Sequence, residues 1–500
     1  MTDSIYSEFI EAKDGTYIPL LKSGKTLESR YNPQRDAENI INNLDQEYSF
    51  FIILGIGSGL LIKNLFERFA NCKIISVELN QSDYDFLKMN ENTKNILSNK
   101  NLIEANKDNL NNLIINNYIP AKYGNIKIIE QKNWLSEIGN YIGNYKEKLF
   151  NDIQKAINII SADFSVQAHF GKIWTCNILN NVKLISKNKN KVDFSFDIQK
   201  KALIVAAGPS LDKEISYIKD NKDDLFIIST DTAFNSLLKN EIEADLVVSL
   251  DAQSISHNHF INSKLVRNTC FAFDLCGNSS AAKHIIEKGY KHFFFISGHP
   301  LSTLFNYFTQ NSLIKLEAGA GTVTLAALDF AIKAAFKNIE ILGADFGYTN
   351  GKAYTKGSYL DNLYNFTAYK INSSEKQFDN LLFRTELKQV SKTKFTTQIL
   401  EAYKYSLIDF LNNHKLTYNY KNDIYYIENN SKSTNNFVIK TLNYDISFLD
   451  FINFLKDFKK EEVETALLPY ISWLRKKSKY ENLDYGEFLK LAHSFIVSYN

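Results

Sequence analysis

Short apolar runs alternate with segments of helical spacing over residues 1–365 of the chain. Apolar runs bounded by turn residues predict buried strands, and the amphipathic segments between them predict helices. Strands that alternate with helices are typical of mostly parallel sheets with helices on both faces. The predicted strands are residues 49–54, 73–78, 203–207, 225–229, 246–250, 270–273, 293–296 and 339–342, and the clearest helices between them are 60–70 and 322–336.

This pattern predicts an α/β protein with two Rossmann-like units and a mainly helical C-terminal region. We expect an N-terminal Rossmann-like domain with a helical linker at 1–190, a central catalytic domain at 191–365 and a mainly helical domain at 366–500. The last of these loses the strand–helix alternation. Its predicted elements are helices at 399–411, 446–458 and 463–477 and a hairpin that joins 416–420 to 423–427, and the polar run at 186–191 is the candidate linker.

Composition narrows the class of protein. The chain has 500 residues, 44% of them hydrophobic, and its 58 basic and 56 acidic residues are interleaved to a net charge of +2. Such a chain can bury real cores, and it has no basic arm of the kind that binds nucleic acid. The four cysteines lie far apart, the first residues are acidic, and no apolar stretch is long enough to span a bilayer. We therefore expect a cytoplasmic protein with no nucleic-acid or membrane partner.

The most informative motif is the turn Gly208-Pro209-Ser210, which ends an apolar run and precedes a helix-compatible segment. The start of a helix offers free backbone N–H groups and the positive end of a dipole, and these can hold a phosphate without a metal. An ordinary strand-to-helix turn is the alternative. The next strands also end in polar residues, in Asp231-Thr232 and Asp251. Three polar strand ends in succession favour a cleft at the carboxyl end of the sheet.

Two further segments carry candidate binding groups. Small residues around Gly321 lead into a helix, where Thr322 and Thr324 add hydroxyls to the free amides, although a closely packed helix entry would need the same small residues. Asp345 ends another strand, and the loop after it carries Tyr348 and Tyr354. Tyrosine hydroxyls can bind or protonate a departing phosphate oxygen, although an ordinary aromatic loop is the alternative.

A Gly-rich turn at Gly55–Gly59 follows the first predicted strand, and Glu78 ends the second. This arrangement holds nucleosides in S-adenosylmethionine-dependent methyltransferases, where a carboxylate binds the ribose hydroxyls. Rossmann-like units also keep such a turn without a bound cofactor, and both interpretations stay open. The eight histidines show no metal-ligand spacing, so we expect no metal site. His257 and His259 follow Asp251 on the expected cleft side.

Taken together, these motifs resemble the flagellin glycosyltransferases called motility associated factors, whose core is grouped with the MptE-like domain. The resemblance covers Gly208–Asp212, Ser229–Ala233, Ser249–Gln253, Gly321–Thr324 and Gly343–Phe346, and it extends to Arg30–Glu38 and the Gly55–Gly59 turn. It implies transfer of a nonulosonic acid, of the pseudaminic or legionaminic type, from a CMP-activated donor to Ser or Thr of flagellin. The donor is then a substrate, and no cofactor is expected.

The same core is similar to bacterial sialyltransferases that use CMP-sialic acid. That resemblance implies nucleotide-sugar binding by Gly208, Pro209, Ser210, Thr232, Gly321, Thr322, Thr324 and Asp345, with Tyr348 and Tyr354 on the leaving phosphate. Those enzymes use a histidine base after the tyrosine loop, but no histidine occurs here between Tyr354 and His414. Asp231, Asp251, His257 and Glu317 are the candidate bases.

Two other functions stay open at this stage. MptE-like proteins include a 6-hydroxymethylpterin pyrophosphokinase that uses ATP and magnesium, and this chain would then be a phosphotransferase. The third possibility is a chaperone or export adaptor that binds flagellin without catalysis.

Overall fold

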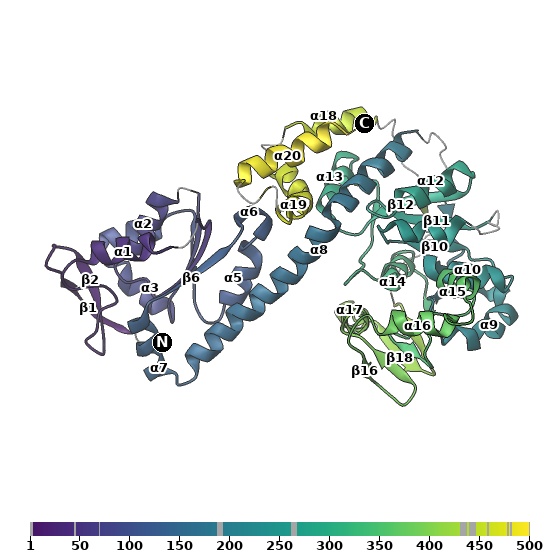
Figure 1. Ribbon diagram of the computed structural model, residues 1–500, viewed down its shortest axis with the longest axis horizontal. Helices are drawn as coiled ribbons and strands as arrows, with labels where there is room; N and C mark the ends of the chain where they lie inside the picture. The colour runs from purple at the N-terminus through teal and green to yellow at the C-terminus, as the bar shows by residue number, and fades with distance from the viewer. Residues whose placement is uncertain are drawn as a thin grey trace. The chain divides into compact units, whose positions relative to one another are not determined.

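The computed structural model describes residues 4–44, 47–69, 71–187, 194–261, 268–430, 438–439, 447–457, 460–477, 480 and 483–499. The chain forms two compact units (Figure 1). The first unit contains residues 1–171 and 468–490, and the second contains residues 172–467 and 491–500. The sequence pattern instead divides the chain into three consecutive domains. The predicted boundary at 190/191 and residues 188–191 of the predicted linker lie outside the described residues.

The first unit is built on a four-stranded parallel sheet with the strand order β5-β4-β3-β6. The predicted strands at 49–54 and 73–78 are confirmed as its two central strands. β3 is the first of these strands in the chain. β4 and β5 are added on one side of it and β6 is added on the other, so the strand order reverses between β3 and β6. Ligands of open α/β sheets bind at such a reversal, beyond the carboxyl ends of the strands. The strands are β3 (Phe50–Leu54), β4 (Lys73–Val77), β5 (Leu102–Ala105) and β6 (Ile126–Glu130).

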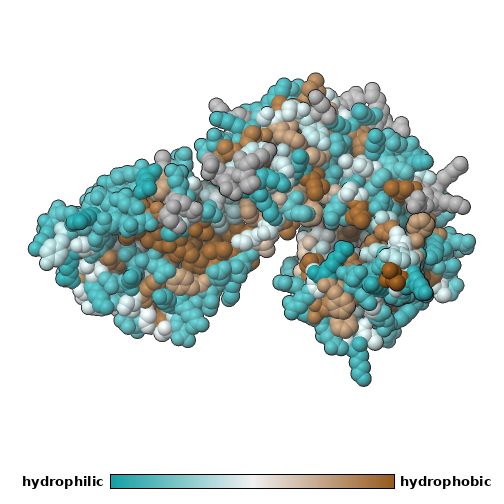
Figure 2. Space-filling view, viewed as in Figure 1, coloured by the Kyte–Doolittle hydropathy of each residue, from teal (hydrophilic) through white to brown (hydrophobic). Residues whose placement is uncertain are grey.

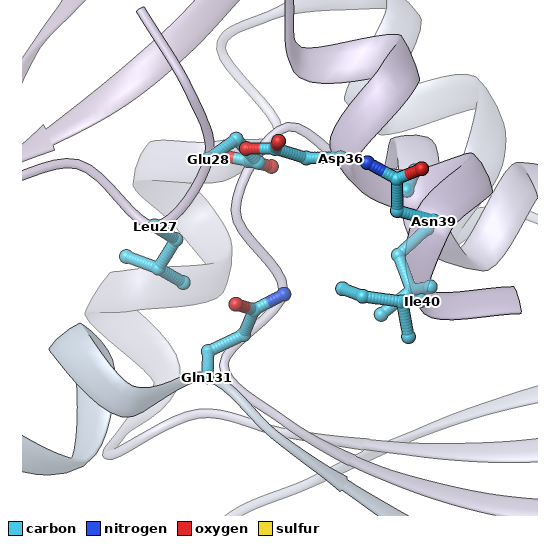
Figure 3. Close-up of a pocket in the computed structure, with 8 residues that line it drawn as sticks. Leu27, Glu28, Asp36, Asn39, Ile40 and Gln131 are labelled. Atoms are coloured by element: carbon cyan, nitrogen blue, oxygen red, sulfur yellow. The ribbon is translucent and has the colours of Figure 1, made fainter. Parts of the chain in front are cut away.

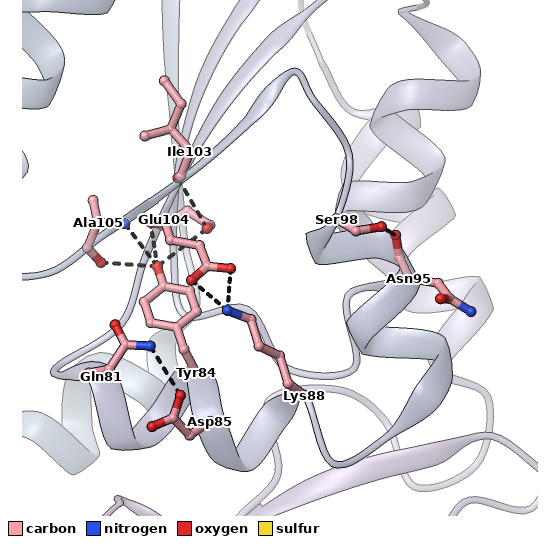
Figure 4. Close-up of polar contacts among 10 residues, drawn as sticks. Gln81, Tyr84, Asp85, Lys88, Asn95, Ser98, Ile103, Glu104 and Ala105 are labelled. Carbon is pink, nitrogen blue, oxygen red and sulfur yellow. Dashed lines mark hydrogen bonds and ion pairs between the residues drawn. The ribbon is translucent and has the colours of Figure 1, made fainter.

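Helices and a hairpin surround this sheet. Tyr84 of α3 anchors its helix, because its buried hydroxyl donates to the Ser76 carbonyl at 2.7 Å and accepts from the Ala105 amide at 3.0 Å (Figure 4). Lys88 pairs with Glu104 at 2.7 Å on the outer side of the same contact (Figure 4). The other elements are β1 (Tyr6–Glu11), β2 (Tyr17–Leu21), α1 (Pro33–Asn42), α2 (Leu60–Arg68), α3 (Gln81–Leu87), α4 (Glu91–Leu97), α5 (Leu110–Asn117), α6 (Pro120–Tyr123), α7 (Lys132–Tyr141) and the first part of α8 (Tyr145–Lys187).

The second unit contains a nine-stranded sheet with the order β13-β12-β11-β10-β9-β8-β14-β19-β18. The strands from β13 to β14 are parallel, as the sequence predicts, and the order reverses between β8 and β14. All residues of β9 are buried, and its first four, Leu225–Ile228, form the apolar run that predicts it. The strands are β8 (Lys201–Val205), β9 (Leu225–Thr230), β10 (Leu246–Ser249), β11 (Cys270–Asp274), β12 (Lys291–Ile296), β13 (Ile314–Lys315), β14 (Asn338–Leu342), β18 (Thr417–Lys421) and β19 (Ile424–Glu428).

The hairpin predicted at 416–420 and 423–427 forms as β18 and β19. β19 pairs antiparallel with β14, with Ile427 opposite Ile339, so the hairpin extends the central sheet. The sequence pattern assigns the hairpin to a separate part of the chain because this pairing joins residues far apart in sequence. The smaller sheets are formed by β15 (Tyr348–Thr349), β16 (Lys388–Gln389) and β17 (Lys394–Thr396), and by β7 (Phe194–Ser195) with β20 (Val438–Ile439).

Helices cover both faces of the central sheet. Alternate strand residues such as Ile204 and Ile228 form one core with α14 and with Leu407 and Phe410 of α17. On the other face, Phe234 of α10 packs edge-on against Phe271 of β11, with ring centroids 5.6 Å apart. The helices of the chain from residue 211 onward are α9 (Leu211–Asp220), α10 (Asp231–Lys239), α11 (Asn258–Ile261), α12 (Ser279–Glu287), α13 (Pro300–Phe308), α14 (Val323–Lys333), α15 (Tyr359–Thr367), α16 (Ser374–Leu382), α17 (Gln398–Asn413), α18 (Phe448–Leu455), α19 (Glu461–Arg475) and α20 (Tyr485–Val497), with 3-10 turns at Lys222–Asp224 and Ser254–His257. Not all of them contact the central sheet, since parts of α19 and α20 belong to the first unit.

The helices predicted in the last third of the chain are present as α17, α18 and α19, and residues 446 and 458 of the predicted second helix lie outside the described residues. The face of the molecule seen in Figure 2 is mostly hydrophilic, with hydrophobic residues gathered in patches on both units. Within the described ranges, no helix combines the length and the apolar character needed to cross a bilayer. The cytoplasmic location stays a prediction.

Candidate active site

The turn Gly208-Pro209-Ser210 lies where the strand order reverses, directly after β8 and beside the end of β14. The Gly208 amide donates to the Gly343 carbonyl at 2.8 Å. A Cβ atom at Gly208 would lie 2.4 Å from that carbonyl oxygen, and one at Gly343 would lie 2.1 Å from the Ala206 carbonyl oxygen. Both glycines are therefore required by the close approach of the two strand ends.

Asp345 binds Ser210, the residue that precedes the helix after this turn. Its carboxylate accepts hydrogen bonds from the Ser210 amide at 2.9 Å and from the Ser210 hydroxyl. Burial raises the pKa of Asp345, and the bonds from Ser210 oppose that rise. The amides of Leu211 and Asp212 donate back to the turn itself. The amides that the sequence assigns to a phosphate are thus already bonded within the chain, and the turn shapes the floor of the site.

The second predicted phosphate-binding segment is the start of α14. Its backbone amides differ from those of the Gly208–Ser210 turn in their hydrogen bonding. None of the described residues accepts a hydrogen bond from the amides of Val323, Thr324 or Leu325. Gly321 is exposed, with φ at +94° and open space around it, whereas Thr322 and Thr324 are buried. The start of this helix therefore offers both unbonded amides and the positive end of the helix dipole.

Asp231 joins the ends of β9 and β10. It is 2% exposed, and its carboxylate accepts from the Ser249 hydroxyl at 2.7 Å and from the Thr232 amide and hydroxyl at 2.7 and 3.0 Å. Both carboxylate oxygens are thus engaged by neighbouring groups. The predicted residues Asp231 and Thr232 are brought together, in an arrangement that fixes their side chains rigidly.

Asp251 lies beside this group at the end of β10. Burial raises the pKa of Asp251, and the negative charge of Asp231 raises it further. The Gln253 amide, which donates to Asp251 at 2.9 Å, opposes the rise, as does the charge of His259. A half-buried carboxylate with a raised pKa is a stronger base than a solvated aspartate.

The histidine that lies near Asp251 is not the one that the sequence predicts. The ring of the predicted residue, His257, contacts His284 of α12 edge-on, with centroids 5.7 Å apart. Burial lowers the pKa of His257, and the charge of His284 lowers it further. His259 instead lies within electrostatic reach of Asp251 and contacts the ring of Tyr359. The structure therefore associates His259 with the carboxylates, two residues after the position that we predicted.

Tyr348 and Tyr354 pack together on a small apolar cluster formed around Ala353, Phe378 and Leu382. The loop that carries them is fixed by Asp212, whose carboxylate accepts from the Thr355 hydroxyl and from the Lys356 amide at 3.0 Å.

Burial raises the pKa of Tyr354 to about 12, and the charges of Tyr348, Tyr403, Tyr364 and Asp231 contribute. The Tyr354 phenol is therefore neutral at pH 7 and can donate a hydrogen bond.

Tyr403 of α17 is a member of the site that the sequence did not reveal. It lies within electrostatic reach of both Tyr354 and Asp251, and burial, followed by the charge of Asp251, raises its pKa. Ser406 lies three residues further on the same helix face, and its hydroxyl accepts from the Ala320 amide at 3.2 Å. α17 thus links the start of α14 to the tyrosine and carboxylate group.

One candidate base, Glu317, lies apart from this group. Glu317 is exposed and faces His414, with a nitrogen–oxygen distance of 4.0 Å. His414 follows the last residue of α17, about 16 Å along the helix axis from Tyr403 at the usual rise per residue. The structure therefore does not place Glu317 or His414 among the carboxylates and tyrosines. Within the described part of the chain, no group of three His, Cys, Asp or Glu residues is arranged to hold a metal ion.

The Gly-rich turn of the first unit is filled by the chain's own side chains. Glu78 is fully buried and accepts from the Ile56 amide at 2.7 Å, the Tyr6 hydroxyl at 3.0 Å and the Trp134 ring nitrogen at 2.7 Å. Glu28 occupies the turn itself, where its carboxylate accepts from the Ser58 amide and hydroxyl.

A Cβ atom at Gly55 would lie 2.6 Å from Trp134, and one at Gly57 would lie 2.2 Å from Glu28. Glu28 also lines a cavity of about 240 Å³ beside α1 (Figure 3). These glycines make room for side chains of the protein, so the positions that would hold a nucleoside are taken.

Comparison with known proteins supports the predicted architecture. Residues 176–351 match the family described as 6-hydroxymethylpterin diphosphokinase MptE-like. The chain is also similar over its whole length to the Maf glycosyltransferase from Magnetospirillum magneticum AMB-1, with a TM-score of 0.53, 12% identity and coverage of 98% of this chain and 90% of that one. The predicted resemblance to motility associated factors is thereby confirmed at the level of the fold and of the central domain.

Three proteins of Treponema pallidum (strain Nichols), each described as uncharacterized, are similar in sequence. The first is 33% identical over 145 residues, which are 29% of this chain and 67% of the relative. The second is 36% identical over 135 residues (26% and 48%), and the third is 27% identical over 239 residues (45% and 39%). The match spans less than half of the second and third relatives. The chain belongs to the family of the first of these relatives, has an MptE-like domain at its centre and shares the fold of a Maf glycosyltransferase.

Proposed function

We propose that the protein is a glycosyltransferase that moves a nonulosonic acid, of the pseudaminic or legionaminic type, from its CMP-activated form to Ser or Thr hydroxyls of flagellin in the cytoplasm, and so serves flagellar assembly and motility. The observation that carries the proposal is the grouping of phenols with carboxylates at the carboxyl end of the central sheet. There Tyr354 lies within electrostatic reach of Asp231, and Tyr403 lies within electrostatic reach of Asp251. The fold shared with a Maf glycosyltransferase supports the reaction class.

The phenols and the start of α14 are the groups that would act on the donor. When the bond to the sugar breaks, negative charge develops on the departing phosphate while the sugar becomes oxocarbenium-like. Neutral hydroxyls of Tyr348 and Tyr354 would donate hydrogen bonds to that charge, and the unbonded amides of α14 would stabilise it further.

The carboxylates would act on the acceptor. A Ser or Thr hydroxyl must lose its proton as it attacks the sugar, and a base with a pKa near the working pH does this best. Asp251 has a raised pKa and a histidine, His259, in electrostatic reach, whereas both oxygens of Asp231 are engaged by its neighbours. We assign the base to Asp251 and give Asp231 the role of holding the end of β10 in place.

The test is the intact mass of flagellin co-expressed with this protein and a pathway that supplies the CMP-nonulosonic acid. We expect mass added in steps of one sugar, and loss of those steps in the Tyr348→Phe, Tyr354→Phe double variant. Tyr369→Phe is the matched control, because Tyr369 is 60% exposed and outside the site. Flagellin of unchanged mass with the native protein would overturn the function, and full modification by the double variant would overturn the site.

The family description favours one alternative, phosphoryl transfer from ATP to 6-hydroxymethylpterin. That reaction uses magnesium, so it would stop in EDTA, while the proposed glycosyl transfer is expected to continue. Formation of the pterin diphosphate by the purified protein, with no change in flagellin mass, would establish the alternative.

A further inference from the structure

Two buried asparagines hold the turn that follows Asp251, the carboxylate to which we assign the base. Asn177 lies in the last third of α8 and is 9% exposed, and Asn278 directly precedes α12 and is 6% exposed. Their hydrogen bonds go to the backbone around Asp251 and to the first turn of α12. Any effect of these side chains on the Asp251 carboxylate therefore passes through the turn.

The side chain of Asn177 makes all the hydrogen bonds that its amide group allows. Its Nδ2 donates to the Ala252 carbonyl at 3.0 Å and to the Cys276 carbonyl at 3.2 Å. Its Oδ1 accepts from the Ser279 amide at 3.4 Å and from the Ser279 hydroxyl at 3.2 Å. A side-chain amide has two N–H donors and two acceptor lone pairs, so it is saturated here. The residue after Asp251 is thereby tied to α8 and to the loop that follows β11.

Asn278 holds the same turn from the loop that follows β11. Its backbone amide donates to the Asp251 carbonyl at 3.0 Å, and its Nδ2 donates to the Gln253 carbonyl at 2.8 Å. Its Oδ1 accepts from the Ala281 amide at 2.9 Å and caps the start of α12. The two asparagines together thus bind the carbonyls of all three residues 251–253.

The position of this turn determines the surroundings of the Asp251 carboxylate. The Gln253 amide donates to Oδ1 of Asp251 at 2.9 Å, and this bond opposes the rise in the pKa of Asp251 that burial causes. The charge of Asp231 raises that pKa and the charge of His259 lowers it, while Tyr403 lies within electrostatic reach. A shift of the turn would therefore change the direction in which the carboxylate faces and the pH at which it loses its proton.

We propose that Asn177 and Asn278 are positioning residues for the glycosyl transfer, which hold the turn so that the Asp251 carboxylate faces the acceptor hydroxyl. The inference rests on the proposed function, in which Asp251 takes the proton of the attacking Ser or Thr. Among the described residues, the hydrogen bonds of the two asparagines do not include Tyr348, Tyr354 or the start of α14. Binding of the donor should therefore be independent of them.

The test is the rate of sugar transfer to flagellin by Asn177→Ala and Asn429→Ala, measured at several pH values. Asn429 is the matched control, because it is 6% exposed and its Nδ2 also donates to two backbone carbonyls, of Ile332 at 3.2 Å and of Phe336 at 3.1 Å. It follows β19 beside the first residue of β14, at the opposite end of the sheet from the site. Thermal unfolding of both variants compares their losses of stability.

We expect Asn177→Ala to lower kcat by roughly ten- to hundredfold, because small misplacements of a reacting group have effects of this size. The KM for the donor should stay within about twofold of the native value. The acidic limb of the pH profile should move to higher pH, because a weaker bond from the Gln253 amide raises the pKa of Asp251. Asn429→Ala should keep the native kcat and pH profile. An equal loss of kcat in both variants, or an unmoved pH profile in Asn177→Ala, would overturn the proposal.

Asn278→Ser provides the test if Asn177→Ala does not fold. A serine keeps a cap for α12 but removes the side-chain donor to the Gln253 carbonyl, so we expect kcat to fall by about tenfold with the same movement of the pH profile. A native rate and profile in this variant would contradict the positioning role alone. If the native chain transfers no sugar to flagellin, the proposed function fails and the role of the asparagines falls with it.

Discussion

The carboxylate of Asp345 accepts two hydrogen bonds from Ser210, one from the amide at 2.9 Å and one from the hydroxyl. Ser210 precedes the first residue of α9, and Asp345 follows β14, so the contact fastens the start of a helix to the neighbouring strand end. A buried carboxylate there also meets the positive end of the helix dipole. The pair therefore holds together the ends of β8 and β14, the two strands between which the strand order of the second unit reverses.

Asp345→Ala should lower the free energy of unfolding by about 1 to 3 kcal/mol, because it leaves the Ser210 amide and hydroxyl without their acceptor. Asp220→Ala, at the last residue of α9, is the matched control and should change stability by no more than about 0.5 kcal/mol. Urea unfolding of both variants measures the difference. Equal stability of the two would show that the contact adds nothing to the fold.

Tyr354→Phe should lower the rate of sugar transfer by roughly a hundredfold, if the phenol donates to the departing phosphate as proposed. Tyr403→Phe should produce a smaller loss, because Tyr403 acts beside Asp251 on the acceptor side. Both variants keep the aromatic ring and its packing, so unfolding curves should not change. The rate of CMP release from the donor measures the reaction. A Tyr354→Phe enzyme with native turnover would contradict the role given to the Tyr354 phenol.

Stability should fall as the pH rises from about 5 to 8. Burial raises the pKa of Glu78 from 4.5 to about 8, with the nearby Asp83 contributing, so the folded chain keeps a proton that the unfolded chain releases in this interval. The folded state then binds more protons, and its free energy of unfolding decreases by roughly 3 to 4 kcal/mol across the window. Burial raises the pKa of Glu28 to about 7, which adds in the same direction.

Urea unfolding at several pH values, followed by tryptophan fluorescence, measures this slope. Glu78→Gln cannot lose a proton, and its stability should vary much less with pH. A variant that keeps the full slope would contradict the role of Glu78.

Gly343→Ala should be far more costly than Gly289→Ala. Both glycines have positive φ, +69° and +77°. An alanine in that conformation destabilises the folded state by about 1 to 2 kcal/mol at either position. At Gly343 the new Cβ atom would also lie 2.1 Å from the Ala206 carbonyl oxygen, whereas nothing lies within 4 Å at Gly289. Thermal unfolding should separate the two variants clearly, and equal midpoints would contradict the close approach of β8 and β14.

The local pattern predicts β3, β4 and most strands of the second sheet because buried parallel strands read as apolar runs, as β3 does. It does not predict β5 or β6, which are only partly buried and contain charged residues, or the two-residue β13. The hairpin of β18 and β19 is also visible locally, but its pairing with β14 is not, since Ile339 and Ile427 are far apart in sequence. The same limit hides Tyr403, which reaches the site only because α17 packs on the central core.

Side-chain roles at strand ends are harder to predict than the strands themselves. A strand-end carboxylate such as Asp345 looks the same in the sequence whether it binds a ligand or a neighbouring turn, and here it binds Ser210 before α9. Glu78 follows the pattern of a ribose ligand, yet Tyr6 and Trp134 take its hydrogen bonds. Only the positions of those distant residues decide which role applies.

The hairpin of β18 and β19 also determines which strand ends the central sheet. Without it, the backbone of β14 would present unpaired amides and carbonyls on its outer side, a template on which a second chain could add a strand. With it, the outermost strand on that side is β18, whose residues Thr417–Lys421 are all exposed and which ends in a lysine. The opposite outermost strand, β13, has two residues. Both borders are of the short or charged kind that discourages pairing between sheets, so the hairpin replaces an open side of β14 with an edge that a second chain is less able to extend.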